Sequence, residues 1–461
     1  MFDCFEDLLA ARSRGEARGL YSVCSSNSLV VEAAVRRAAK TGRPLLVEAT
    51  ANQVNQEGGY TGMEPETFAA RLRAQCSHFG ASPELVIFGG DHLGPYPWRE
   101  EAADRAMDRA EELVRLFIAA GARKIHLDAS MVLGGDAECG RAGPSGLSLH
   151  PKIAAERSAR LCAAAEEAFR AFSGRKLGAV QPIYVIGTEV PVPGGIGAKA
   201  GAEFLTEDEG PLPTRPDDFR AAVELHRAAF DACGLSGAWA RVLAVVVQPG
   251  VEFDARRVYT YDRRRAKALV EARKDYPGLV FEGHSTDFQP DEALAALVED
   301  GVCILKVGPA LTFALREALF GLDAIAGELG VRYGAGLADT VERAMRNDPT
   351  RWKGYYVPDS SLAFSLKYAY SDRIRYYWER PEVSVALDRL FDSLRGREIP
   401  PQLISQYLPR FGSVHESTWA IPAPEELAIA AVDSELQRYE AACYPAVKHE
   451  GEAPRGEKGR A

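Results

Sequence analysis

Three features that often identify a protein from its sequence are missing from this 461-residue chain. No two cysteines stand in CxxC spacing, which argues against a disulfide framework and against a cysteine-based zinc site. No GxxxxGK[ST] loop occurs, so a P-loop kinase has no support. No apolar run reaches the length of a membrane span, and the N-terminus has acids where an export signal has its apolar core. We therefore expect a protein that has no membrane partner and is not exported.

The eight cysteines are scattered singly along the chain. Several, among them Cys162, Cys233 and Cys303, lie in apolar runs, so we expect buried free thiols. Unpaired thiols are typical of a reducing compartment, which favours a cytoplasmic protein.

Basic residues are fewer than acidic ones, 55 against 65, which gives a formal net charge of -10. No large cluster of Lys and Arg interleaved with aromatic residues occurs, which argues against a nucleic-acid partner. The basic run Arg263-Arg264-Arg265 is short, and we expect it to be one turn of an exposed helix.

What the sequence does contain is a regular alternation of short apolar runs and longer helical patterns. Each of eight runs of strand length precedes a stretch with the periodicity of a helix. The predicted strands are residues 21–26, 45–49, 85–88, 124–127, 183–186, 242–247, 279–281 and 303–307. Eight such βα units predict a (β/α)8 TIM barrel with enlarged loops.

A doubly wound open sheet would give a similar alternation. That fold usually carries a glycine-rich phosphate turn after its first strand, where this chain has Ser25-Ser26-Asn27. The sequence Gly195-Ile196-Gly197 follows the fifth predicted strand, in a proline-rich loop. The barrel is therefore the favoured architecture.

The character of the chain changes after about residue 330, where strand runs stop, helical patterns dominate and aromatics gather, as in Tyr376-Tyr377-Trp378. We predict that residues 1–330 form the barrel with the site. Residues 331–447 would form a helical extension packed on the barrel or on a partner. Residues 448–461 are charged, and we expect a disordered tail.

Polar residues stand at the ends of the predicted strands, each after an apolar run within a residue or two, although the strands carry almost none in their middles. In a TIM barrel the functional side chains lie at the carboxyl ends of the strands. The residues at these ends are Ser25, Glu48, Asp91, His92, Asp128, Glu189, Gln248, His284 and Lys306. Together they predict a polar pocket with acids, imidazoles and one amine.

Two of these residues, His92 and His284, are candidate metal ligands. With an oxygen from Glu189 or Asp128 they form the mixed nitrogen and oxygen set that suits Zn²⁺, Mn²⁺ or Co²⁺. His126 alternates with Asp128 on one strand and faces the same way, so it lines either the core or the site.

Two further residues have alternative roles. Lys306 ends the eighth strand and is either a Schiff-base lysine or, as the nearby carboxylates favour, a charge partner for an anionic substrate. His226 lies in a helical pattern, where we expect an exposed or capping role.

Several motifs together resemble one known family. They are Gly90-Asp91-His92-Leu93-Gly94, Glu48-Ala49-Thr50, Gly58-Gly59-Tyr60-Thr61-Gly62-Met63, Ile125-His126-Leu127-Asp128-Ala129-Ser130, Gly187-Thr188-Glu189-Val190-Pro191, Gln248-Pro249-Gly250, Gly283-His284-Ser285-Thr286-Asp287 and Lys306-Val307-Gly308-Pro309. As a set they resemble the Z-subunit family of tagatose-bisphosphate aldolase (GatZ/KbaZ). The likeness runs from about residue 21 to residue 320 and continues more loosely beyond.

The family is similar to the class II, metal-dependent aldolases, which implies roles for several residues. By position, Asp91 resembles the general base, His92 and His284 resemble metal ligands, and Glu189 resembles the acid of a loop that approaches the metal. A further metal histidine of those aldolases is missing here, and Gln248 stands as its replacement. The glycine-rich phosphate loop after the last ligand is replaced by residues 285–287, where Asp287 repels a phosphate.

The resemblance implies two different functions. The first is C3–C4 retro-aldol or C4-epimerase chemistry on ketohexoses of the tagatose and fructose type, with Asp91, Glu189 and Asp128 as catalytic groups. In this reading Ser25, Glu48, Gln248, Asp287 and Lys306 bind substrate, and His92, His284, Glu189 and Gln248 hold a divalent ion. Zinc is the first expectation, and manganese, cobalt or nickel are alternatives.

The second function is that of a non-catalytic subunit that stabilises a separate catalytic aldolase chain. For either function we expect a homo-oligomer and a ketose or ketose-phosphate ligand. The altered phosphate loop favours an unphosphorylated or singly charged ketose.

Overall fold

The computed structural model describes most of the chain. The described residues are 3–136, 140–143, 146–174, 179–187, 205–206, 210–332, 334–411, 419–420 and 423–445. The predicted tail at 448–461 lies outside them. No helix among the described residues is both long and apolar enough to cross a membrane.

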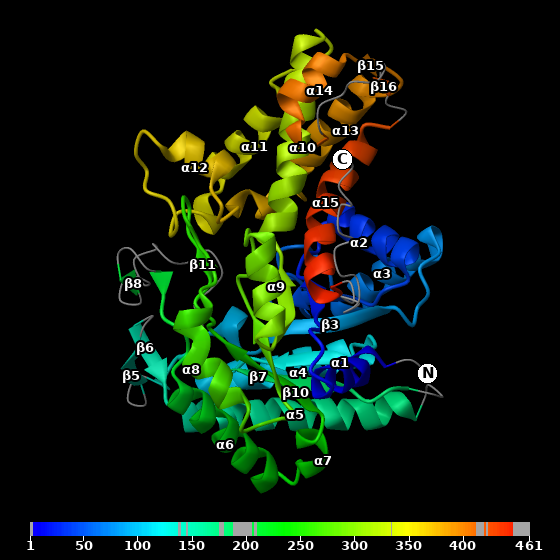
Figure 1. Ribbon diagram of the computed structural model, residues 1–461. Coiled ribbons are helices and arrows are strands. Elements are labelled where there is room, and N and C mark those ends of the chain that lie inside the picture. Colours follow the sequence, from blue (N-terminus) through cyan, green and yellow to red (C-terminus); the bar gives the residue numbers. More distant parts are fainter. Residues whose placement is uncertain are drawn as a thin grey trace, which may run out of the picture.

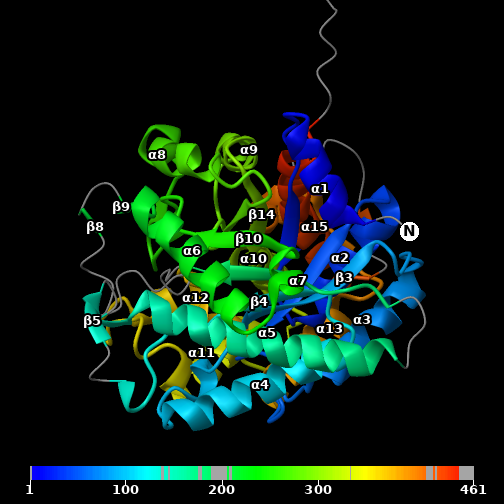
Figure 2. The same cartoon turned by 90° about the horizontal axis from the view of Figure 1, so that it is seen from below.

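Eight parallel strands close into a barrel, in the order β1-β14-β13-β10-β7-β4-β3-β2 (Figures 1 and 2). The strands are β1 Leu20–Val23, β2 Leu45–Thr50, β3 Val86–Leu93, β4 Lys124–Leu127, β7 Ile183–Gly187, β10 Val242–Val247, β13 Val280–Gly283 and β14 Val302–Val307. The first strand pairs with both β2 and β14, so no sheet edge remains. The predicted (β/α)8 barrel is confirmed.

Helices follow the strands and cover the outside of the barrel, as Figure 2 shows from below. They are α2 Ser28–Thr41, α3 Pro65–Phe79, α4 Ala103–Ala119, α5 Pro151–Ser173, α6 Pro216–Ala232, α8 Arg263–Arg273, α9 Asp291–Glu299 and α10 Pro309–Glu328. The helix α8 begins at the basic run because the Asp262 side chain accepts the N–H of Arg264 and caps it.

One end of the barrel is closed by the N-terminal helix α1, Cys4–Ser13. Cys4, Phe5 and Leu8 of this helix are buried in one apolar cluster with inward-facing strand residues. Those strand residues include Leu20, Leu46, Ile87, Val185, Ala244, Val280 and Ile304. Because the strands are parallel, the opposite end, where they terminate, is left for the site.

The helices after α10 gather beside the upper part of that helix (Figure 1). They are α11 Gly336–Asn347, α12 Leu362–Tyr368, α13 Pro381–Leu394, α14 Pro401–Tyr407 and α15 Glu425–Cys443. The last of them returns to pack along α2, α9 and α10. Its Tyr439 hydroxyl donates to the carbonyl oxygen of Thr286, 2.7 Å away, directly behind the end of β13.

All seven described cysteines are free. Cys162 and Cys303 are buried, as expected for thiols in apolar runs, but the expectation for Cys233 is wrong. Cys233 is the residue that ends α6, where the chain turns away from the barrel and leaves the side chain exposed.

Candidate active site

The end of β3 is irregular where it carries Asp91 and His92. Successive residues of a regular strand point to opposite faces, so one of these two side chains would face away from the barrel interior. The pairing with β4 shifts register between Gly90 and Leu93, and His92 has a φ of 46°, in the left-handed region. This bulge allows both side chains to face the same cavity.

Two glycines of this stretch are required by close contacts. A Cβ on Gly90 would overlap the Leu93 side chain, and a Cβ on Gly94 would overlap the carbonyl oxygen of Asp128. The backbone N–H of Asp128 donates to the carbonyl of Leu93, 3.2 Å away. Gly90 therefore leaves room for the Leu93 side chain, and Gly94 lets the irregular end of β3 pack tightly against the end of β4.

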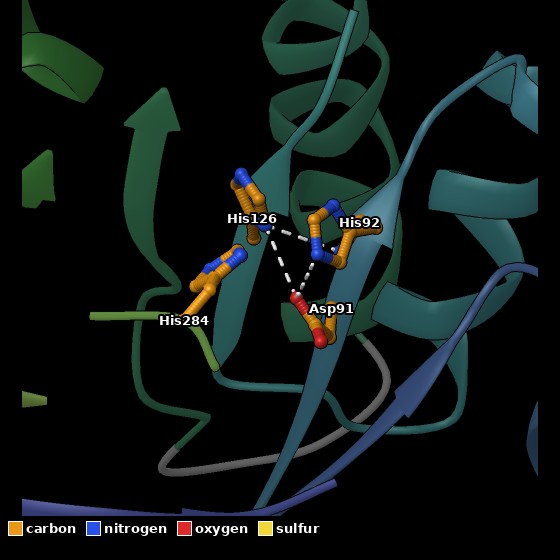
Figure 3. Close-up of side chains that lie close together, drawn as sticks. All are labelled: Asp91, His92, His126 and His284. Atoms are coloured by element: carbon orange, nitrogen blue, oxygen red, sulfur yellow. Dashed lines mark hydrogen bonds and ion pairs between the residues drawn. The ribbon is translucent and has the colours of Figure 1, made fainter. Parts of the chain in front are cut away.

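Four side chains meet at this end of the barrel (Figure 3). Asp91 and His92 come from β3, His126 comes from β4, and His284 follows β13. Each offers one ligand atom, and these four atoms lie within 4.8 Å of one another. The ring of His92 has its centroid 4.6 Å from that of His284 and 4.8 Å from that of His126.

Carboxylates on the far side of the rings fix two of the imidazoles. Nδ1 of His92 lies 2.8 Å from a carboxylate oxygen of Asp128, and Nε2 of His284 lies 3.0 Å from one of Glu282. In each ring the other nitrogen is left with a lone pair when the bonded one carries the proton. Carboxylate–histidine pairs of this kind orient the ligands of metal sites.

The donor set fits a divalent ion. Nδ1 of His284 is buried and has no hydrogen-bond partner among the described residues. An unpartnered buried nitrogen beside two further imidazoles and a carboxylate matches the nitrogen and oxygen coordination that zinc and its neighbours prefer. The residues could hold such an ion without changing their partners on the far side.

Charged side chains also fill the barrel one level below this cluster. The Lys124 ammonium lies 2.7 Å from a carboxylate oxygen of Glu48 and 2.6 Å from one of Glu282. The Lys306 ammonium lies 3.2 Å from Glu282 and also pairs with Asp91. All five side chains are buried, so each charge is balanced by neighbours rather than by water.

These surroundings shift the pKa values in opposite directions. Burial opposes the charge of Lys306, but Asp91, Glu282 and Glu48 outweigh it and raise the Lys306 pKa well above 10.5. The amine therefore stays protonated, which supports a charge partner over a Schiff-base lysine. Burial, reinforced by the Lys306 charge, lowers the pKa of His284 to about 3, so its imidazole is neutral and available as a ligand.

The side chain of Asp287 lies at the start of α10. One of its carboxylate oxygens accepts the backbone N–H groups of Gly308, at 3.0 Å, and of Ala310, at 2.8 Å. Burial raises the Asp287 pKa to about 6, although these two hydrogen bonds act against the rise. The carboxylate thus occupies the amides at which barrel enzymes often bind a phosphate.

The structure does not bring all the other predicted residues to the cluster. The amide oxygen of Gln248 accepts the N–H groups of Gly250 and Val251, and Gln248 is not among the four clustered residues. Glu48 is buried against Lys124 and does not line the cavity, and Ser25 lines a small hollow next to the cavity. Glu189 lies outside the described residues.

The cluster opens into a cavity of about 260 Å³. Asp128, Asp287 and Lys306 line it, and so do residues for which the sequence suggested no role. These are chiefly Tyr60, Tyr96, Arg351, Tyr355, Arg373, Arg375 and Tyr376. Most come from residues 351–376, whose crowded aromatic residues were the only sequence signal.

His226 corrects an expectation, because it is buried on α6 at 3% exposure and neither exposed nor capping. Its Nδ1 lies 2.8 Å from the Ala222 carbonyl.

Burial lowers the His226 pKa to about 4, against 6.5 for an unperturbed histidine. The folded protein therefore favours neutral imidazole, and the unfolded chain binds the additional proton. We expect the free energy of unfolding to fall by roughly 3 kcal/mol as the pH drops from about 6.5 to about 4.

Urea unfolding between pH 7.5 and pH 4.5 measures this loss. His226→Asn keeps a donor near the Nδ1 position and removes the titration, so its stability should depend less steeply on pH. Equal slopes for the two proteins would show that His226 does not contribute.

Comparison with known proteins adds three findings. The chain matches the family described as "D-tagatose-1,6-bisphosphate aldolase subunit GatZ/KbaZ-like" over residues 5–444. A relative from Agrobacterium fabrum (strain C58), named D-tagatose 6-phosphate 4-epimerase, is 47% identical over 439 residues, which is 95% of this chain and 97% of the relative. A crystal structure titled "probable tagatose 6 phosphate kinase", from Sinorhizobium meliloti 1021, is 43% identical with a TM-score of 0.79, over 92% of this chain and 100% of that chain.

Proposed function

The chain belongs to the D-tagatose-1,6-bisphosphate aldolase subunit GatZ/KbaZ-like family, and from this premise we propose that it epimerises ketohexoses of the tagatose and fructose type at carbon 4. The chain is a carbohydrate enzyme of the aldolase or epimerase type, in agreement with the resemblance of its motifs. The name of the relative from Agrobacterium fabrum supports epimerisation as the outcome. The observation that carries the proposal is the group of three imidazoles around Asp91.

We propose that His92, His126 and His284 hold a divalent ion, with zinc as the first candidate. A bound ion would act as a Lewis acid on the carbonyl of the sugar. His126 takes the place that the sequence suggested for Gln248, whose oxygen is engaged by backbone amides. Glu189 keeps its proposed role as an acid that follows β7 in the sequence.

The chain's own groups perform the proton transfers in this proposal. Asp91 accepts the proton of the C4 hydroxyl, the C3–C4 bond breaks, and its electrons pass to the C2–C3 unit as an enediolate. The C4 carbon becomes an aldehyde. When the aldehyde turns and presents its other face, the bond forms again, Asp91 returns the proton, and the C4 epimer results.

Several neighbours support these steps by position. Lys306 pairs with Asp91, which keeps the carboxylate ionised and oriented. Asp128 fixes the ring of His92. We also propose a cytoplasmic homo-oligomer, and a division of the chain into a barrel up to residue 330 and a helical extension after it, whose residues 351–376 contribute to the cavity wall.

The test is to incubate the purified chain alone with D-tagatose, D-fructose, their 6-phosphates, D-tagaturonate and D-tagatose 1,6-bisphosphate. Proton and carbon NMR then follow the configuration at C4 and the release of three-carbon products. We expect interconversion of the two epimers for at least one pair, without accumulation of three-carbon products. Inactivity of the chain alone, with aldol cleavage only when a separate class II aldolase chain is added, would instead support an accessory subunit.

A further inference from the structure

The cavity wall contributed by residues 351–376 is strongly basic. Arg351, Arg373 and Arg375 line the same cavity as the Asp91 and histidine cluster. Arg373 is buried at 6% exposure, Arg375 is half-buried and Arg351 is exposed at the rim. Three guanidinium groups therefore face a space that elsewhere contains the reacting groups of the proposed function.

The side-chain hydrogen bonds of Arg373 and Arg375 go to neutral groups. Nε of Arg373 donates to the Arg351 carbonyl at 2.6 Å, and Nη1 of Arg375 donates to the carbonyls of Ser371 and Asp372. Among the described residues, none of the three forms an ion pair with a carboxylate within 4 Å. The carboxylate of Asp372 acts electrostatically on Arg375, but it accepts from Thr312 and lies 4.0 Å from Arg316.

Aromatic rings hold the guanidinium groups in position. Arg373 lies 3.7 Å from the ring centroid of Tyr355 and 4.6 Å from that of Tyr376, and Arg375 lies 4.6 Å from Tyr376. Arg351 lies over Tyr60 and Tyr376. Stacking on a ring leaves the edge of a guanidinium, with its N–H donors, available to a ligand.

The positive charges of these arginines lower the pKa of Tyr376. Burial by itself would raise the pKa of this phenol, but Arg373, Arg375 and Arg351 outweigh burial and lower the pKa to about 8. Three guanidinium groups that line one cavity, with no ion pair of their own among the described residues, favour an anion there.

We propose that Arg351, Arg373 and Arg375 bind the phosphate of a ketose monophosphate, whose sugar carbons then reach the histidine cluster. The inference rests on the proposed function for the identity of the sugar. A phosphate monoester carries about two negative charges, and its oxygens match the fork of donors on arginine. The amides at the start of α10 are taken by Asp287, so a second anion site in the cavity explains how this barrel accepts a phosphate.

The experiment measures binding and turnover separately. Calorimetry gives the Kd of D-tagatose 6-phosphate, D-tagatose, D-tagaturonate and inorganic phosphate, and NMR gives kcat/KM for the two sugars and the uronate. The variants are Arg373→Gln, Arg375→Gln and Arg351→Gln. Arg380→Gln is the matched control, because Arg380 pairs with Asp348 and does not line the cavity.

We expect wild-type protein to prefer the phosphate ester over the free sugar and the uronate. Each of the three substitutions should weaken the ester by roughly 10- to 100-fold and change the free sugar by less than about twofold. Arg351→Gln removes a rim side chain, so it remains informative if the substitutions at Arg373 and Arg375 impair folding.

Each other outcome has a definite meaning. Equal weakening of ester and free sugar, or tighter binding of the uronate than of the ester, would overturn the phosphate site. Ester binding that depends on the arginines but is followed by no turnover would support the site and contradict the proposed function. Turnover of the ester that none of the three substitutions affects would support the proposed function and contradict the phosphate site.

Discussion

Replacing Asp91 by asparagine is expected to lower kcat for C4 epimerisation by about 10²- to 10⁴-fold, the range in which positioned general acid–base groups act. An amide has nearly the shape of a carboxylate but cannot accept the proton of the C4 hydroxyl. Asp91 is the carboxylate that clusters with the three imidazoles, and it contacts both His126 and Lys306. The loss should appear in kcat more than in KM, because the sugar is held mainly by other groups.

Asp136→Asn is the matched control for this result. Asp136 is also a buried acid, at 7% exposure, but it pairs with Arg157 away from the cavity. Its substitution should affect stability and leave kcat within about twofold. If Asp91→Asn keeps more than about a tenth of the activity while it is correctly folded, Asp91 is not the base.

The second large effect is expected from removing one imidazole. His284→Ala and His126→Ala should each abolish stoichiometric binding of a divalent ion and reduce turnover to background, because each removes one of three nitrogen ligands. Metal analysis after gel filtration, by plasma mass spectrometry, measures the bound ion directly. Dialysis of the wild-type protein against a chelator should remove the activity, and zinc or manganese should restore it.

Gln248→Ala decides between the ligand set suggested by the sequence and the set suggested by the geometry. The Gln248 side chain accepts two backbone amides and is absent from the cluster, so its substitution should leave the metal content unchanged. Loss of the ion in Gln248→Ala, with full metal content in His126→Ala, would favour the sequence-based assignment.

The barrel was predictable from the sequence because each of its strands and helices is indicated by a pattern within a short segment of the chain. Most of the buried parallel strands are mainly apolar runs, and the helices that follow them have the 3.6-residue helical period, so seven of the eight strands were located within three residues of their observed bounds. The polar residue after each run marked the strand ends for the same reason. The bounds differ most at the end of β3, which was predicted at residue 88 and continues through the bulge to Leu93.

The candidate site was less predictable because it depends on contacts between distant segments. Whether His126 faced the core or the cluster could not be read from alternation alone, since the inward side of a barrel strand contains both. That Asp91 and His92 face the same cavity depends on a bulge, and a regular strand would have separated them. The arginines at 351–376 lie far along the chain, and only the folding of the extension over the barrel brings them to the cavity.

The position of α1 has a consequence for the order of events during turnover. Phe5 and Leu8 close the far end of the barrel, so the cavity lies at the carboxyl ends of the strands, where residues 351–376 form part of its wall. In the proposed reaction, both halves of a sugar cleaved between C3 and C4 lie beside the wall that carries Arg373 and Arg375. A fragment retained there would meet its partner again before it could diffuse away, so recombination would outpace release. A cavity that keeps the two fragments together suits the proposed epimerase better than a lyase.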